Sequence, residues 1–378
     1  MRSILDNVQY LDGSEVATLR WINERAVLRN LIESDQDRSV TDIARACGLS
    51  RPTVEGALAQ LLEDDWVIES PPRTSGSGAG RPAKRYEFAD HSRVVVGVDL
   101  GPHNVVCSVA TMRGEALADA RLSDLDLTDG QAALDALREC LRLALGDAGL
   151  TADRIIALTV GLPAIVSAVG EIVLTVVVPA WQEFGLPQRI RAAFPGADVL
   201  FENDAKLATA AEHAWGSATG AGSAVNVIVG RRVAAGVISE SRLVRGVHGG
   251  AGEIGAFSAA RWDGVYDRLG GEAGSIEQTF ADAAAGEVDA QQRLDTFILD
   301  LSQGIAALCL VIDPEVVVVG GGVAQLGDRL IRPLRDAVNE LTLFPVELRA
   351  SSLGHSAVAR GGVALSRDHV ARSVLRIT

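Results

Sequence analysis

From residue 94 onward, short apolar runs alternate with segments of helical periodicity, and this alternation constrains the fold more than any other feature. The runs are rich in Val, Ile and Leu and end at glycines or small polar residues. Strands that alternate with helices in this way are typical of α/β folds. The sequence therefore predicts an α/β protein, with strands at residues 94–101, 105–111, 155–161, 197–201, 225–229, 233–238 and 316–319.

The run that ends at Phe201 continues into Glu202, Asn203 and Asp204, and a helical pattern follows over residues 205–215. A strand that ends on small polar residues places an amide and a carboxylate at the rim of a sheet, where a small polar ligand can bind. Asn and Asp are also among the best N-capping residues, so a purely structural role is available to both. The residues alone leave the two interpretations open.

The composition excludes several classes of protein. The 378 residues suffice for two or three domains, no apolar run reaches the roughly 18 residues of a membrane span, and the N-terminus lacks the apolar segment of a signal peptide. A net charge of −14 argues against a general nucleic-acid coat and leaves only local basic patches. We expect a reduced, cytoplasmic protein without a metal site, because its four cysteines stand far apart: Cys47, Cys107, Cys140 and Cys309.

The first ninety residues predict a helix-turn-helix. We expect a loose arm at residues 1–20 and helical structure from Trp21 onward. Residues 39–54 then indicate a helix, a tight turn at Gly48 and a second helix with Ser50 as its cap and Pro52 in its first turn. The second helix, residues 51–64, is the candidate recognition helix. Its predicted DNA contacts near the N-terminal end are Arg51, Thr53 and Glu55.

A two-stranded ribbon is predicted to follow, which would complete a winged helix. Residues 66–69 and 81–88 read as strands, and the loop at 71–80 is rich in Pro, Gly and Ser. Basic residues without intervening acids suit phosphate contacts; they are Arg73, Arg81, Lys84 and Arg85. Residues 1–93 hold 12 basic and 15 acidic side chains, so a protein–protein module stays an alternative. The turn chemistry and the basic wing favour double-stranded DNA.

Five motifs, taken together, resemble the ROK family (repressor, open reading frame, kinase), a branch of the sugar-kinase and actin-like superfamily. They lie at residues 99–101, 161–163, 202–205, 249–255 and 314–322. The resemblance implies a winged helix at 21–90 followed by a two-lobed actin-like (ribonuclease H-like) fold with a cleft. The first lobe would comprise residues 94–204 and 361–378, and the second, for effector binding and dimerisation, residues 205–360.

The chain departs from the family pattern where ATP phosphates would bind. Active members have glycine and threonine after the first Asp-x-Gly, whereas this chain has Pro102 and His103. Proline donates no N–H, so one potential phosphate contact is absent. The second phosphate loop carries Arg231 and Arg232 in place of small residues, and their side chains crowd a cradle that needs bare backbone. We therefore expect no enzymatic activity and no cofactor, although the turn at residues 320–322 is retained.

The zinc site of the family is also altered. Ala256 stands where the family has a histidine, and residues 268–277 match its cysteine-rich run without any cysteine. Zinc needs thiolate or imidazole ligands, so none is expected here. What the resemblance does retain is a set of polar residues that would bind a sugar or sugar derivative, namely Asn203, Asp204, Glu253 and Glu277. In a kinase Asp204 would be the general base; each member of the set also has a structural role available as a cap or solvated acid.

These observations predict a DNA-binding transcriptional regulator, a repressor, with a degenerate sugar-kinase-like effector domain. Two-fold symmetry would match a palindromic operator, so we expect a homodimer or a tetramer. An effector bound between the lobes would change operator affinity through the linker at residues 89–93. Two alternatives stay open: an active sugar kinase with an added DNA-binding domain, and a regulator that senses a protein partner.

Overall fold

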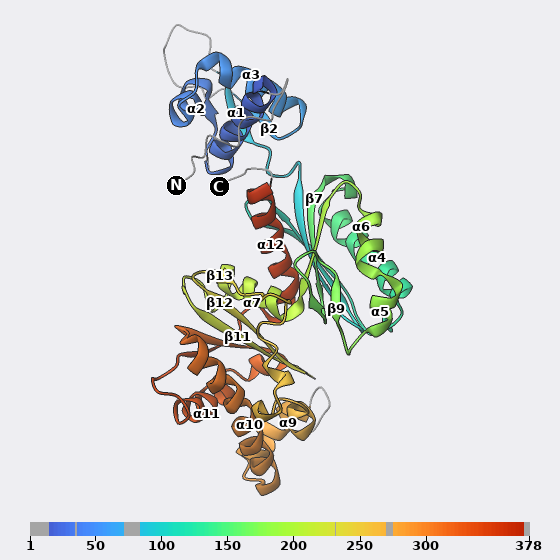
Figure 1. Cartoon of the computed structure of the whole chain (residues 1–378), viewed down its shortest axis with the longest axis vertical. Coiled ribbons are helices and arrows are strands. Elements are labelled where there is room, and N and C mark those ends of the chain that lie inside the picture. The colour runs from blue at the N-terminus through green and yellow to red at the C-terminus, as the bar shows by residue number, and fades with distance from the viewer. Residues whose placement is uncertain (1–14, 35, 72–83, 231, 270–274, 374–378) are drawn as a thin grey trace. The chain divides into compact units, whose positions relative to one another are not determined.

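The computed structural model describes residues 15–34, 36–71, 84–230, 232–269 and 275–373. Its contacts divide the chain into two compact units (Figure 1). The first unit draws on the described parts of residues 1–94, 111–115 and 367–378. The second comprises residues 95–110 and 116–366, and it contains two five-stranded sheets.

The first unit is a small helical domain with a three-stranded sheet. Its core is made by apolar residues that recur at helical spacing, among them Val27, Leu31, Ile43, Val54 and Leu58, all at most 2% exposed. Its elements are α1 (Glu15–Ile32), β1 (Arg38–Ser39), α2 (Val40–Cys47), α3 (Arg51–Glu63), β2 (Val67–Ser70) and β3 (Arg85–Phe88).

Local capping chemistry places the helix-turn-helix where the sequence predicted it. Ser39 accepts from the N–H of Asp42, whose carboxylate accepts from the N–H of Ser39, and this reciprocal capping box begins α2. Gly48 ends α2 in the left-handed conformation (φ +67°), and Ser50 caps α3 by accepting from the Thr53 N–H. The helix predicted at residues 51–64 is confirmed as α3, which ends at Glu63. Its role in DNA recognition stays a prediction.

Two expectations for this unit need correction. Residues 1–20 were predicted to be a loose arm, but α1 already begins at Glu15, and residues 1–14 lie outside the described chain. The ribbon was predicted to have two strands, but the sheet has the order β1-β3-β2, because Arg38 and Ser39 pair with Tyr86 and Arg85. The two residues of β1 are too short to carry a periodic signal. Residues 72–83, which cover most of the loop predicted at 71–80 and the start of the strand predicted at 81–88, lie outside the described residues.

A turn from the middle of the chain belongs to the first unit. The Arg113 guanidinium donates to the carbonyl of Leu31, in the last turn of α1, at 3.3 Å and to that of Ser34, just after the helix, at 2.7 Å. Its Nε lies 3.7 Å from the Asp90 carboxylate. Arg367 in turn donates to Met112 O at 3.0 Å. A cation at a helix C-terminus satisfies carbonyls that have no partner within the helix.

The first sheet of the second unit has the order β10-β7-β4-β5-β6. β10 runs parallel to β7, with Asn203 opposite Leu162, and β5 runs antiparallel to β6. Figure 1 shows α4, α5 and α6 on one face of this sheet and α12 on the other. The elements are β4 (Val94–Leu100), β5 (Val105–Thr111), β6 (Ala116–Leu122), α4 (Gly130–Asp147), β7 (Ile155–Leu162), β8 (Ile165–Val166), β9 (Ile172–Leu174), α5 (Pro179–Phe184), α6 (Leu186–Ala193), β10 (Asp198–Asn203) and α12 (Ala357–Ser373).

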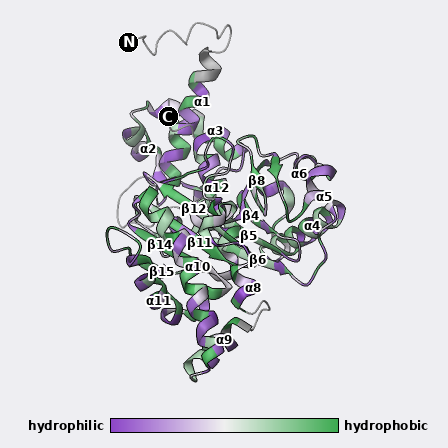
Figure 2. Cartoon of the chain, turned by 60° about the horizontal axis from the view of Figure 1, so that its bottom comes forward, coloured by the Kyte–Doolittle hydropathy of each residue, from purple (hydrophilic) through white to green (hydrophobic). Residues whose placement is uncertain are grey.

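The second sheet has the order β13-β12-β11-β14-β15, with α7 on one face and α10 and α11 on the other (Figure 1). β11 is parallel to β14 and antiparallel to β12. Apolar residues follow the strands of both sheets, whereas the outer helices mix apolar and polar residues (Figure 2). The elements are α7 (Asp204–Trp215), β11 (Ala224–Val229), β12 (Val233–Ser239), β13 (Arg242–Leu243), α8 (Val265–Leu269), α9 (Ser275–Ala284), α10 (Val288–Ile312), β14 (Val316–Gly321), α11 (Asp328–Asn339) and β15 (Leu348–Ala350).

Helix α12 fits tightly between the two sheets because glycines face both neighbours. A Cβ at Gly361 would lie 1.8 Å from Leu207 O in α7, and one at Gly362 would lie 2.6 Å from the Cα of Gly97 in β4. No residue with a side chain is accommodated at such distances. The C-terminal helix therefore joins β4, which carries Asp99, to α7, which begins at Asp204.

Helix α10 is the one helix of the described chain that is long and apolar enough to span a membrane, which the sequence reading had not anticipated. Its buried residues, such as Phe297, Leu301 and Ile305, belong to the core of the second unit. Length and apolarity here reflect a central core helix.

A buried carboxylate on α10 holds the segment before α8. Asp300 is 0% exposed, pairs with Arg261 at 2.5 Å, and accepts from Arg268 Nε at 3.1 Å. Arg268 also donates to the carbonyls of Asp263 and Arg261. These contacts hold residues 261–269 against the core helix.

We predict that the double variant Arg261→Ala/Arg268→Ala is less stable than Asp300→Ala. The double variant leaves a buried charge without its partners, whereas the single variant leaves two half-exposed guanidinium groups in contact with water. We expect losses of about 2–4 and about 1–2 kcal/mol, discounted for the exposure of the arginines. Urea unfolding measures both, with Arg332→Ala in an exposed pair as the control. Equal losses for the two variants would contradict this order.

Candidate functional site

The turn between β10 and α7 is fixed by its own polar side chains. Asn203 Oδ1 accepts from the Lys206 N–H at 3.1 Å and caps α7, and its Nδ2 donates to Ala164 O at 3.2 Å. Glu202 accepts from the Asn203 N–H with one oxygen and pairs with Arg245 Nε at 2.5 Å with the other. The capping role of Asn203 is thus established. A ligand contact by Asn203 stays a prediction and must use its remaining hydrogen and lone pair.

Two carboxyl groups near this turn hold protons more tightly than usual. Burial raises the pKa of Asp99 to about 7, and the charge of Asp204 adds to this, while Arg121 opposes it. Burial also raises the pKa of Asp204 to about 6; the Ala205 N–H opposes this rise and the charge of Glu253 adds to it. One Asp204 oxygen accepts from the Ala205 N–H at 2.7 Å. Perturbed carboxyl groups of this kind favour a binding site.

Close backbone packing sets the path of the loop that carries Glu253. A Cβ at Gly252 (φ +87°) would lie 2.1 Å from Ala235 O, and one at Gly249 (φ +77°) would lie 2.1 Å from Val166 O. Both positions therefore require glycine. The loop brings Glu253 near enough to Asp204 for its charge to raise the pKa of that carboxyl. That the two side chains share a ligand stays a prediction.

Sequence reasoning missed three charged residues at this site, namely Glu202, Lys206 and Arg245. Lys206 is 0% exposed, and its Nζ has no hydrogen-bond partner among the described residues. Burial lowers the pKa of Lys206, and the charges of Glu253, Glu202 and Asp204 oppose this. The sequence does show Lys206 inside an alanine-rich helical pattern. That pattern alone does not reveal its burial, because a lysine on an isolated helix would point to solvent.

The position that corresponds to the family's zinc site has a different organisation. No group of His, Cys, Asp and Glu that could hold a metal occurs in the part of the chain that the structure describes. Arg268, at the first cysteine position of the run, binds Asp300 instead. Glu277 lies in α9, but the structure does not describe its side chain, and it does not describe residues 270–274. Its predicted role as a ligand contact therefore stays a prediction.

The two turns that would receive nucleotide phosphates use their N–H groups internally. The Gly101 N–H donates to Asn104 O at 2.9 Å, and the Gly230 N–H donates to Arg232 O at 3.1 Å. The carbonyl of Pro102 accepts from the Leu127 N–H. Arg231 lies outside the described residues, and Arg232 is exposed. These N–H groups are not free to bind an anion in this conformation.

The predicted DNA-contacting residues fall into three groups. Arg51 and Glu55 are exposed on α3, and Thr53 is half-buried with its hydroxyl 2.7 Å from that of Ser50. Lys84 pairs with Glu69 at 2.7 Å. Arg85 pairs with Asp37 at 2.9 Å and also donates to its carbonyl, so its guanidinium is engaged within the domain. Arg73 and Arg81 lie outside the described residues.

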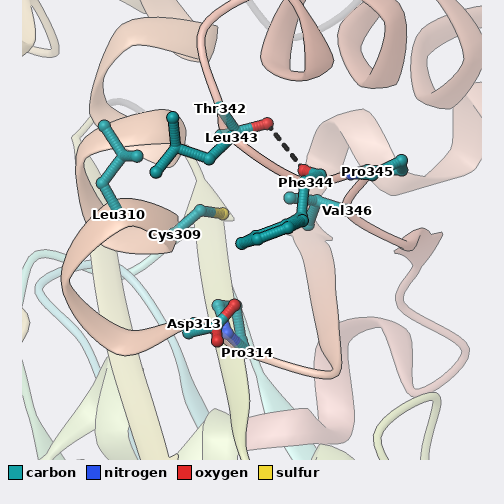
Figure 3. Close-up of a pocket in the computed structure, with 9 residues that line it drawn as sticks. All are labelled: Cys309, Leu310, Asp313, Pro314, Thr342, Leu343, Phe344, Pro345 and Val346. Carbon is teal, nitrogen blue, oxygen red and sulfur yellow. Dashed lines mark hydrogen bonds between the residues drawn. The ribbon is translucent and has the colours of Figure 1, made fainter.

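A pocket at the end of α10 has a different character (Figure 3). Most of its lining residues are apolar, and two of them, Leu343 and Phe344, are 82% and 70% exposed. Its one hydrogen bond in the figure is internal, from the Thr342 hydroxyl to Phe344 O at 3.0 Å. A sugar needs several converging polar groups. The polar residues near Asp204 and Glu253 match this requirement better than the pocket at the end of α10 does. The lining residues are Cys309, Leu310, Asp313, Pro314, Thr342, Leu343, Phe344, Pro345 and Val346.

We predict a pH-dependent stability effect of Asp99→Asn. The folded Asp99 keeps its proton up to about pH 7, whereas the unfolded chain releases it near 3.8, so stability falls as pH rises between these values. The variant should therefore be more stable than the unmodified protein by about 1–3 kcal/mol at pH 8 and equal to it near pH 4. Urea unfolding at both pH values tests this, with exposed Asp147→Asn as the control. A difference independent of pH would contradict it.

Comparisons with known proteins agree with this geometry. The ROK family matches residues 95–264 and 265–369, and the IclR helix-turn-helix domain matches residues 26–71. A putative xylose repressor of Caldicellulosiruptor sp. (strain Rt8B.4) is 23% identical over 92% of this chain and 96% of its own length. A glucokinase of Halalkalibacterium halodurans is 25% identical over 71% of this chain and 94% of its own length.

Solved structures show the same fold. The crystal structure of a ROK family transcriptional regulator, a homolog of the E. coli MLC protein, covers 94% of this chain and 98% of its own, with a TM-score of 0.68 and 21% identity. A ROK family glucokinase from Streptomyces griseus, in complex with glucose and AMPPNP, covers 73% of this chain and 99% of its own, with a TM-score of 0.59 and 19% identity. The chain belongs to the ROK family and joins a helix-turn-helix DNA-binding domain to the family's sugar-kinase-like fold.

Proposed function

We propose that this protein is a repressor whose operator affinity is set by a sugar or sugar derivative bound at Asp204 and Glu253. The observation that carries the proposal is one chain with both an exposed helix of a helix-turn-helix and two neighbouring carboxylates, Asp204 and Glu253, that have acceptor oxygens without a side-chain donor among the described residues. In this proposal the sugar-kinase-like fold binds the effector, and the helix-turn-helix domain binds the operator. The protein acts on chromosomal DNA and therefore in the cytoplasm.

The exposed face of α3 supports docking in a major groove. Arg51 and Glu55 lie one helical turn apart on α3. The exposed positions that follow Glu55 include the small residues Gly56 and Ala59. Small residues let the helix approach base edges closely, and arginine can bind guanine through two hydrogen bonds. One such helix reads a short half-site, so we propose a homodimer on a palindromic operator.

The acceptors at the start of α7 support a polyhydroxyl effector. One oxygen of Asp204 and both oxygens of Glu253 have no donor among the described residues. Vicinal hydroxyls supply donors at the spacing that carboxylates accept. The matched relative named a putative xylose repressor makes D-xylose the first sugar to test, with D-glucose second because a glucokinase matches as well.

The internal hydrogen bonds at Gly101 and Gly230 support a sensor that does not phosphorylate its ligand. Without free N–H groups for the phosphates, Asp204 as general base has no acceptor to serve. ATP-dependent phosphorylation of a sugar that disappears in Asp204→Asn would establish the kinase alternative instead.

We propose two routes from the sensor to the DNA-binding domain. Residues 89–93 lead directly into β4, which carries Asp99. The next two strands, β5 and β6, are connected by the turn that contains Arg113. The guanidinium of Arg113 donates to carbonyls at the end of α1. A shift of the strands would reach α1 through the linker and through this turn. An effector can shift the equilibrium only by its differential affinity for the two states, typically about 1–3 kcal/mol.

We predict that Arg51→Ala weakens binding to a duplex selected by the protein from a random library by about 1–3 kcal/mol, because a base contact is lost. Fluorescence anisotropy at fixed salt measures this. Arg142→Ala, which removes the same charge on α4, is the matched control and should leave affinity unchanged. Equal weakening by the two substitutions would indicate a general charge effect and contradict a recognition role.

We predict that D-xylose or D-glucose changes operator affinity about 5- to 150-fold, and that Asp204→Asn and Glu253→Gln abolish this response. Both variants should keep the sugar-free affinity for DNA, since neither residue touches the recognition helix. Anisotropy titrations with and without sugar measure the effect. A response to no sugar, together with an unchanged operator affinity in both variants, would favour a protein partner as the signal.

A further inference from the structure

Lys206 is a buried cation that has no hydrogen-bond acceptor among the described residues. It is one of two lysines in the chain, it is 0% exposed, and its Nζ is unsatisfied among the described residues. An ammonium group removed from water without a partner destabilises a fold. A structural role would require a partner, so the position calls for another explanation.

The neighbouring carboxylates explain why no partner is available inside the protein. Glu202 and Glu253 are the charges that most oppose the lowering of the Lys206 pKa by burial, followed by Asp204, and Arg245 acts in the other direction. Glu202 is already occupied by the Asn203 N–H and by Arg245. Glu253 and Asp204 lie near Lys206 without an ion pair to it. The site thus holds an unused donor beside unused acceptors.

We propose that Lys206 is a ligand-contacting residue whose ammonium donates to a hydroxyl oxygen of a polyhydroxyl ligand, while other hydroxyls of that ligand donate to Asp204 and Glu253. This assignment rests on the proposed sugar-sensing function. A hydroxyl group both donates and accepts, so one sugar ring can satisfy the lysine and the carboxylates together. A purely anionic or purely cationic ligand satisfies only one of the two sets.

The charges around the site select among sugars. Four carboxylates face it or lie next to it, namely Asp99, Asp204, Glu202 and Glu253. The cations that face these groups are Lys206, Arg245 and, beside Asp99, Arg121. At pH 8, where Asp99 with its pKa of about 7 is mostly ionised, the described residues carry an excess of negative charge here, and an added phosphate or carboxylate would meet repulsion. The site therefore takes an uncharged or amine-bearing sugar in preference to a sugar phosphate or sugar acid.

Lys206→Met separates ligand contact from structural support, because methionine matches the length of the side chain without its charge. We expect a melting temperature at least as high as that of the unmodified protein, since an unsatisfied buried charge is removed. Affinity for D-xylose or D-glucose, measured by isothermal titration calorimetry, should fall at least tenfold. Lys84→Met, at the only other lysine, should leave both quantities unchanged.

Lysine-selective ¹³C labelling provides a second measurement on the unmodified protein, independent of whether the variant folds. Two side-chain signals are expected, and Lys84→Met assigns them. Saturation with D-xylose or D-glucose should move the Lys206 signal and leave that of Lys84 in place. D-Glucosamine should bind as well as the neutral sugars or better, and D-glucose 6-phosphate at least tenfold more weakly.

The outcomes distinguish the assignment from the function on which it rests. Binding of a neutral sugar with an unmoved Lys206 signal, or with unchanged affinity in Lys206→Met, overturns the role of Lys206 and leaves the sugar sensor intact. Tighter binding of D-glucose 6-phosphate overturns the charge selection. Absence of binding for all four probes overturns both the assignment and the proposed effector.

Discussion

The capped turn at the start of α7 is the constraint on which the rest of the site depends. Asn203 ties the first turn of α7 to Ala164, and Glu202 ties the same turn to Arg245. These contacts fix where α7 begins, and with it the position of Asp204. They also point Lys206 into the interior. The polar groups of this turn hold the backbone in place.

The chain has the sugar-kinase-like fold of its family, but the two turns that would receive nucleotide phosphates and the stretch at the family's zinc site are organised differently. The turns at Gly101 and Gly230 are closed by backbone hydrogen bonds, so these two N–H groups are already engaged within the protein. Arg268 stands at the first cysteine position of the family's cysteine-rich run, and it forms an ion pair with the buried Asp300. This ion pair helps to hold residues 261–269 against α10.

Much of the fold could be predicted because local chemistry agrees with the final structure. The capping residues Ser39 and Ser50 define the two helices of the DNA-binding motif, and the valine-rich runs define the central strands of both sheets. Local chemistry failed where the partner is distant in sequence. The two residues of β1 are a strand only because Tyr86 and Arg85 pair with them, and Arg113 joins the first unit only through the carbonyls of α1.

By itself the sequence determined the family, the order of the domains and the polar set at Asn203, Asp204 and Glu253, because these follow from motifs and from periodicity along the chain. The tertiary structure alone decided which of these groups are already occupied. It assigned Asn203 to capping, engaged Arg85 with Asp37, and buried Lys206 without a hydrogen-bond partner among the described residues. The physical reason is that hydrogen-bond satisfaction and desolvation depend on neighbours brought together by folding, and a linear pattern does not contain them.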